Sequence, residues 1–132
     1  MRSSRGGWCC QVAITTQSLT RRQEGFGVPY AELPFEGKNT NKRIGVLKAQ
    51  QQQIAKLFKD GDEPGHRKQT IDAYFYLRMA WERAVEEVLL RHVVLRLRKG
   101  IETQRLAGVV VEDSDYTAVN TGMTKCSNYA RN

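Results

Sequence analysis

The longest amphipathic pattern in the chain lies between residues 71 and 90 and predicts a helix. At about 100° per residue, apolar side chains recur on one broad arc of this helix, and polar ones gather on the opposite side. Arg78 and Glu82 break the pattern, because both fall near the middle of the apolar arc. Buried charges are costly unless they are paired or hydrogen-bonded, so this pair is the sharpest feature of the sequence. The apolar arc consists of Ile71, Tyr74, Phe75, Leu77, Trp81, Ala84, Val85, Val88 and Leu89, and the opposite side carries Asp72, Tyr76, Arg83, Glu86, Glu87 and Arg91.

A second helical pattern precedes this one. Apolar residues alternate at spacings of three and four with one polar member among them, which is a seam of the coiled-coil type. Asn39 or Thr40 is placed to cap this helix. An acidic stretch with Gly and Pro at residues 60–65 then breaks the chain, so helices over about residues 42–59 and 66–92 are predicted to form an antiparallel hairpin. The seam consists of Ile44, Leu47, Gln51, Ile54 and Phe58.

After residue 92 the pattern weakens, and two interpretations stay open. Helix continuation is one, while alternation between residues 93 and 98 favours a short strand, with residues 109–111 as a second strand. A last helix follows, capped by Asp113 or Ser114. Its apolar face consists of Tyr116, Val119, Met123 and Cys126. The predicted fold class is therefore mainly α, an antiparallel helical hairpin plus a short C-terminal helix, with a small β-hairpin around residues 93–111 as an option.

The length of the chain limits the number of domains, and its net charge indicates the class of partner. The chain has 132 residues, enough for one domain, and its net charge of +7 with a pI near 9.6 favours an anionic partner such as nucleic acid. A solvated basic surface would have the same composition. Residues 1–27 are basic, rich in Ser and Thr and only weakly apolar, so they are predicted to be a disordered or non-native tail. Residues 28–132 are predicted to be a helical domain fragment.

The cysteines and the absence of several motifs limit the cofactors, metals and reactions expected of this chain. Three cysteines with neither disulfide nor zinc spacing indicate a reduced, cytoplasmic protein, and no apolar run is long enough for a membrane span. The sequence has no phosphate loop, no Gly-rich dinucleotide turn, no serine elbow and no paired-histidine metal helix. We therefore expect no cofactor and no metal, and no ATP hydrolysis by this chain alone.

Two groups of residues are candidates for a functional site. Arg78 could bind a phosphate while Glu82 deprotonates a hydroxyl, which is the pair that phosphodiester cleavage needs. The alternative is an ion pair that fixes the register of the helix. Basic residues after the long helix could bind an RNA or DNA backbone, or be a solvated rim. They are Arg91, Arg96, Arg98, Lys99 and Arg105.

The segments "LRMAWERAVEEVLL" and "KCSNYA" carry a family resemblance. Residues 28–130 resemble the region after the ATPase core in bacterial P-loop (AAA-type) ATPases related to the anticodon nucleases, which cut transfer RNA in phage defence. In those nucleases the C-terminal helical part is similar to HEPN-type ribonuclease domains. The resemblance implies an active site of an arginine, a glutamate four residues later and a more distant histidine. Arg78 and Glu82 match the first two.

The chain departs from that family at its end. The relatives have His-Asp after the "CSNYA" segment, where this chain has Arg131 and Asn132, and the nucleotide-binding half is absent. His92 is a poor replacement, because ten residues of helix place it about 15 Å from Glu82. The resemblance therefore implies a truncated or decayed fragment that binds RNA, with transfer RNA as a candidate, and has impaired or lost cleavage.

A different class of function stays open beside this one. The chain would then be a non-catalytic interaction module, whose hairpin seam meets a P-loop ATPase or a second copy of itself. A third alternative is a fragment that folds only with the missing ATPase half.

Overall fold

A computed structural model of the chain describes residues 18–22, 25–30 and 33–130. The chain divides into two compact units, one ending at Pro34 and one starting at Phe35. In the first unit, strands β1 (Ser18–Arg22) and β2 (Gly25–Tyr30) pair antiparallel with a shift of register near Arg22. Most of the predicted tail over residues 1–27 lies outside the described residues, and its described part belongs to these strands.

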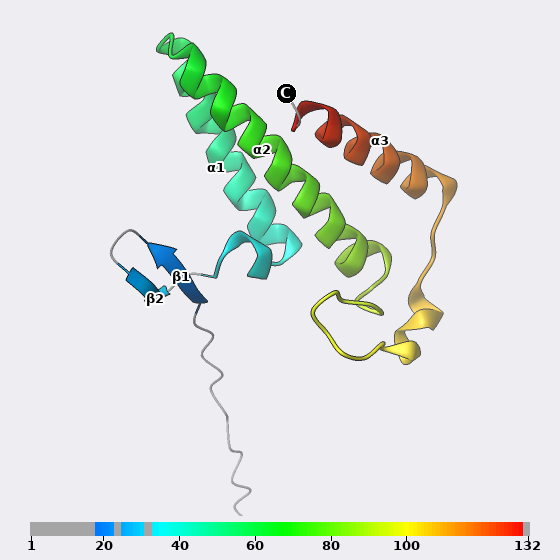
Figure 1. Cartoon of the computed structure of the whole chain (residues 1–132). Coiled ribbons are helices and arrows are strands. Elements are labelled where there is room, and N and C mark those ends of the chain that lie inside the picture. Colours follow the sequence, from blue (N-terminus) through cyan, green and yellow to red (C-terminus); the bar gives the residue numbers. More distant parts are fainter. Residues whose placement is uncertain (1–17, 23–24, 31–32, 131–132) are drawn as a thin grey trace, which may run out of the picture. The chain divides into compact units, whose positions relative to one another are not determined.

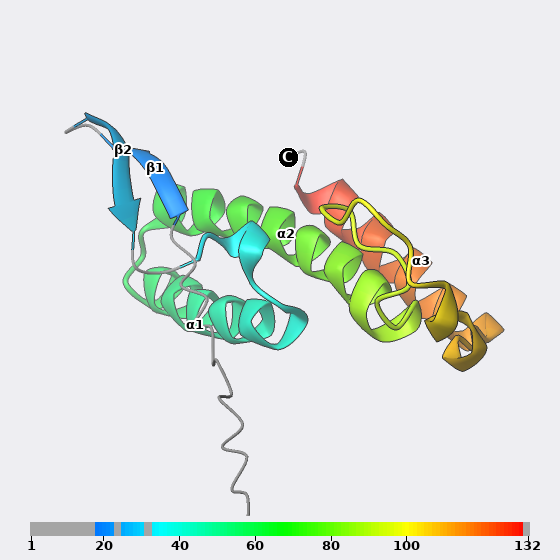
Figure 2. The same cartoon turned by 90° about the horizontal axis from the view of Figure 1, so that it is seen from below.

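The second unit is built from three helices. They are α1 (Thr40–Lys59), α2 (Glu63–Ala84) and α3 (Asp113–Tyr129), and α2 lies between the other two (Figure 1). Helices α1 and α2 form an antiparallel hairpin, and α3 lies along α2 in both views (Figure 1, Figure 2). The prediction of a mainly helical fold, with a hairpin and a C-terminal helix, is confirmed.

Side-chain caps set where the hairpin helices begin. The Asn39 side chain accepts a hydrogen bond of 2.9 Å from the Lys42 N–H, as predicted, and α1 begins at the next residue. Between the helices, Gly61 has a φ of 75°, a value that favours glycine. Asp62 then caps α2 by accepting from the Gly65 N–H, and Pro64 suits the first turn. Helix α2 therefore starts at residue 63, three residues before the predicted start.

Helix α2 ends in a wider turn. Residues Val85–Leu89 form a π-helical turn, in which the Leu90 N–H donates to the Val85 carbonyl at 2.8 Å. Arg91 and His92 then have φ values of 46° and 61°, and this left-handed backbone stops the helix. The predicted end at residue 92 was therefore too late.

The β-hairpin considered for residues 93–111 does not form; no strand lies in this stretch, all of which the structure describes. The Glu102 N–H donates to the Val93 carbonyl and closes a loop, and a 3-10 turn follows at Thr103–Gly108. Val93 is buried at the end of α2, whereas Leu97 is 91% exposed. The alternation in sequence was therefore not the alternation of a sheet with one buried face.

Helix α3 packs on α2 through few, close contacts. It begins at Asp113 with Glu112 as its N-cap, so the predicted caps Asp113 and Ser114 lie inside the helix. Cys126 is buried, and this burial raises the pKa of its thiol. The Tyr129 ring stacks on Tyr74 with ring centroids 4.8 Å apart. Tyr116 is exposed, whereas Val119 and Met123 are half-buried, so the predicted apolar face is used from Val119 onward.

The hydrophobic core is small. Among the residues with described side chains, the buried hydrophobic ones are Ala80, Val93 and Cys126. No helix among the described residues is both long and apolar enough to cross a bilayer. With so little apolar burial, polar contacts and an exact fit between helices carry much of the packing.

We predict that Gly122→Ala destabilises the protein and that Gly45→Ala does not. A Cβ on Gly122 would lie 2.6 Å from the nearest atom of the Trp81 indole, whereas one on Gly45 would meet nothing within 4 Å. Overpacking costs about 1–3 kcal/mol, more than the ~0.5–1 kcal/mol that alanine contributes in a helix. Urea titrations of both variants measure the free energy of unfolding, and equal gains in stability would contradict the close α2–α3 contact.

Candidate functional site

Arg78 and Glu82 lie at the contact between α2 and α3. The Arg78 Nε is 3.5 Å from the Glu82 Oε1, and the two side chains are 43% and 29% exposed. The Arg78 Nη1 also donates to the Ser127 Oγ of α3 at 3.2 Å. Phe75 is 55% exposed and does not seal the pair from water. The pair is thus neither a buried ion pair nor an open one, because α3 contacts its arginine.

Glu82 has a second cationic partner. Arg96, in the loop after α2, donates from Nη1 to the Glu82 Oε2 at 2.7 Å and from Nε to Glu86. These hydrogen bonds, first from Glu86 and then from Glu82, raise the pKa of Arg96. Each oxygen of the Glu82 carboxylate therefore faces a guanidinium group.

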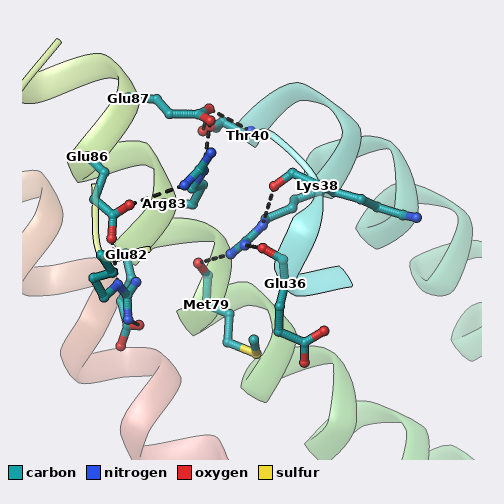
Figure 3. Close-up of polar contacts among 10 residues, drawn as sticks. Glu36, Lys38, Thr40, Met79, Glu82, Arg83, Glu86 and Glu87 are labelled. Carbon is teal, nitrogen blue, oxygen red and sulfur yellow. Dashed lines mark hydrogen bonds and ion pairs between the residues drawn. The ribbon is translucent and has the colours of Figure 1, made fainter. Parts of the chain in front are cut away.

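The ion pairs continue along α2 to the start of α1. Arg83 donates to the Glu87 Oε1 at 2.7 Å and to the Glu86 Oε2 at 3.3 Å, as Figure 3 shows. Glu87 in turn accepts from the Thr40 N–H at 2.8 Å and from the Thr40 hydroxyl at 2.6 Å. An unbroken chain of charged contacts thus links α1, α2, the loop and α3. We call it the α2 charge network; its members are Thr40, Arg78, Glu82, Arg83, Glu86, Glu87, Arg96 and Ser127.

Glu87 lies at the N-terminus of α1. Its side chain is only 10% exposed, and this burial alone would raise the pKa of the carboxyl. The hydrogen bonds from Thr40 and the charge of Arg83 outweigh burial, so the pKa is lowered. A carboxylate at this position also suits the positive end of the helix dipole.

A buried arginine lies beside the α2 charge network. Arg43 of α1 is 4% exposed, and its guanidinium donates to three backbone carbonyls, those of Glu36 and Met79 at 2.6 Å and of Lys38 at 2.9 Å (Figure 3). It also lies over the Phe35 ring, 5.1 Å from its centroid. Burial lowers the pKa of Arg43, as does the nearby charge of Arg83. The spacing of apolar residues did not reveal this residue.

Two of the basic residues predicted to bind nucleic acid are held in ion pairs. Arg96 is held by Glu82 and Glu86, and Arg98 pairs with Glu102 at 2.7 Å. Without a strand, Arg96 and Arg98 do not share a strand face as the alternation predicted. The three other members of the set, Arg91, Lys99 and Arg105, are exposed.

The structure shows another basic surface, on α1. This helix contains five basic residues and no acidic one. Four of the five are exposed lysines, and three of these fall on the side of α1 away from α2, which we call the lysine face. Its members are Lys42, Lys56 and Lys59, and Lys48 lies at its edge. The sequence contains a signal for this surface that the spacing of apolar residues did not reveal: the predicted helix has lysines but no Asp or Glu.

The described residues contain no group of three or more His, Cys, Asp or Glu side chains arranged to hold a metal. His66 contacts the Phe58 ring, with centroids 5.5 Å apart, and His92 lies in the left-handed turn after α2. Neither histidine has a second ligand-type side chain in these contacts.

No family model matches the chain, and neither does any curated protein or solved structure.

We predict that Glu87→Gln lowers the free energy of unfolding at neutral pH by about 1–3 kcal/mol, because a charged acceptor for Thr40 and Arg83 is lost. The folded-state pKa of Glu87 lies below its usual value of 4.5, so its ionised form stabilises the fold above that pH. The difference between wild type and variant should therefore shrink as the pH falls through the lowered pKa. Urea titrations across acid and neutral pH measure this.

The matched control is Glu102→Gln. Glu102 is 43% exposed and pairs with Arg98 at the surface, so a change near zero is expected at every pH. An equal effect of the two substitutions would contradict the role of Glu87 in anchoring α1.

Proposed function

We propose that this chain is a helical RNA-binding module in which phosphodiester cleavage is impaired or lost. The observation that carries the proposal is the lysine face of α1, exposed on a helix with no acidic residue. Lysines in a row along a helix suit the phosphates of a nucleic-acid backbone, and release of counterions then supplies the affinity. The exposed Arg91, Lys99 and Arg105 offer a second set of cations.

The state of the Arg78–Glu82 pair supports the loss of cleavage. A general base needs a free oxygen within hydrogen-bond reach of the proton that it takes. Both Glu82 oxygens face arginines, and Arg78 is shared between Glu82 and Ser127. A phosphate at Arg78 would have to compete with these partners. The resemblance to anticodon-nuclease-related ATPases makes transfer RNA the first target to test.

A second candidate function is a helical protein–protein interaction module. It is favoured by a groove between α1 and α2 whose lining is mostly apolar. Exposed apolar surface of this kind on a small domain is typical of interaction sites.

We expect RNA binding to weaken steeply as salt rises, and the lysine face to set the slope. Replacing Lys42, Lys56 and Lys59 with alanine should lower the slope of log K against log salt by about two to three units. Fluorescence anisotropy with labelled transfer RNA measures this. The charge-matched control replaces Arg91, Lys99 and Arg105 with alanine. A larger effect of the control would move the binding surface to the loop after α2, and binding without a salt slope would overturn the proposal.

We expect the purified chain to leave transfer RNA uncut over hours, as judged by gel electrophoresis. Cleavage by the wild type that disappears on Glu82→Ala would contradict the loss of activity. An Arg131→His variant tests the resemblance directly, since the relatives have histidine there. Cleavage gained in that variant and abolished by Glu82→Ala would identify a decayed nuclease site. Without any gain, the Arg78–Glu82 pair keeps a structural role only.

A further inference from the structure

A groove of about 420 Å³ runs between α1 and α2. The predicted coiled-coil seam supplies its α1 wall, and α2 covers only part of that seam. Ile44 is 42% exposed and Phe58, at the far end of the seam, is 72% exposed. Lys48 is the one charged residue among those that line the groove. Its lining consists of Ile44, Leu47, Lys48, Gln51 and Ile54 from α1 and Thr70, Ala73, Tyr74 and Leu77 from α2.

The seam is nearly symmetric about Gln51. Ile44 and Phe58 lie seven residues before and after it, and Leu47 and Ile54 lie four before and three after. In an antiparallel copy of α1 related by a two-fold axis at Gln51, Gln51 lies opposite the same residue and Ile44 lies opposite Phe58. Leu47 then lies opposite Ala55, and Ile54 lies opposite the aliphatic stem of Lys48. Because an amide both donates and accepts hydrogen bonds, two glutamines facing each other satisfy one another.

The charges on α1 are compatible with such a contact. Lys48 precedes Gln51 by three residues, so the same symmetry places it opposite Ile54 of the other copy, which carries no charge. The lysine face points away from the seam, because its members lie on a different side of the helix. The contact would thus bring no two like charges directly together, which is the electrostatic condition for self-association.

We infer that the groove binds a second copy of this chain, with the α1 helices antiparallel across a two-fold axis at Gln51. The seam from Ile44 to Phe58 is about 21 Å long, and two helices about 10 Å wide give a footprint of roughly 400 Å² per copy. Specific interfaces commonly bury about 800 Å² per partner, so this contact lies at the small end. We expect a dimer that dissociates in the micromolar range. The inference rests on the interaction function and not on RNA binding.

The test is a charge swap at Gln51. This side chain is exposed in the single chain, so Gln51→Glu and Gln51→Lys should leave folding intact, which circular dichroism checks. In the dimer each variant alone would place two like charges on the two-fold axis, weakening association at least about tenfold. An equimolar mixture of the two variants should dimerise again. Sedimentation velocity across the micromolar range measures all three samples beside the wild type.

The matched controls are Gln53→Glu and Gln53→Lys. Gln53 lies nearly opposite Gln51 on α1 and does not line the groove, so both variants should dimerise as the wild type does. A wild type that stays monomeric across this range overturns the inference. So does a dimer that the Gln51 variants leave unchanged. A monomer whose groove binds another protein, with binding blocked by Gln51→Glu, would overturn the second copy as occupant and keep the interaction function.

Discussion

The buried guanidinium of Arg43 fixes the register on which the helical unit depends. It is nearly inaccessible to water, so its donors must find acceptors within the protein. Three backbone carbonyls supply them, from the 3-10 turn Phe35–Gly37, from the residue after it and from the C-terminal half of α2. Only arginine has a rigid fork of donors that reaches three such acceptors at once. With α1 held at Met79, its N-terminus lies next to Glu87, so Thr40 can join the α2 charge network.

The α2 charge network fixes the positions of the helices, as a larger hydrophobic core does in other small domains. Few described apolar side chains are buried, so the positions of α1, the loop and α3 on α2 are set largely by hydrogen-bonded charges. Such pairs add little net stability compared with apolar burial. A charge left without its partner is costly, however, so the pairs favour one particular arrangement of the helices and the loop. Glu82 and Arg96 are paired within this network, although the sequence predicted that Glu82 acts on a substrate and that Arg96 binds a nucleic acid.

The elements that could be predicted from sequence are those whose causes are local. The spacing of Ile44, Leu47 and Ile54 predicted α1, and Asn39 predicted its start, because both depend on neighbours within a turn or two. The role of the polar side of α2 could not be predicted. Glu86 is buried there because α1 and the loop pack against that side, and a periodic pattern says nothing about which elements arrive. The prediction of a strand over residues 93–98 was wrong for the same reason, because an alternating segment forms a strand only when another strand pairs with it.

RNA binding and self-association, as proposed, would affect each other. Each lysine face points away from the seam, so the two-fold axis places the two faces on opposite outer sides of the dimer. Two chains of net charge +7 repel each other at long range, which weakens the dimer at low salt, and a polyanion bound to both copies reduces this repulsion. Linkage then requires the effect to be reciprocal: the factor by which RNA strengthens dimerisation equals the factor by which dimerisation strengthens RNA binding. A seam too small to hold a tight dimer alone is therefore compatible with a dimer that forms on its ligand.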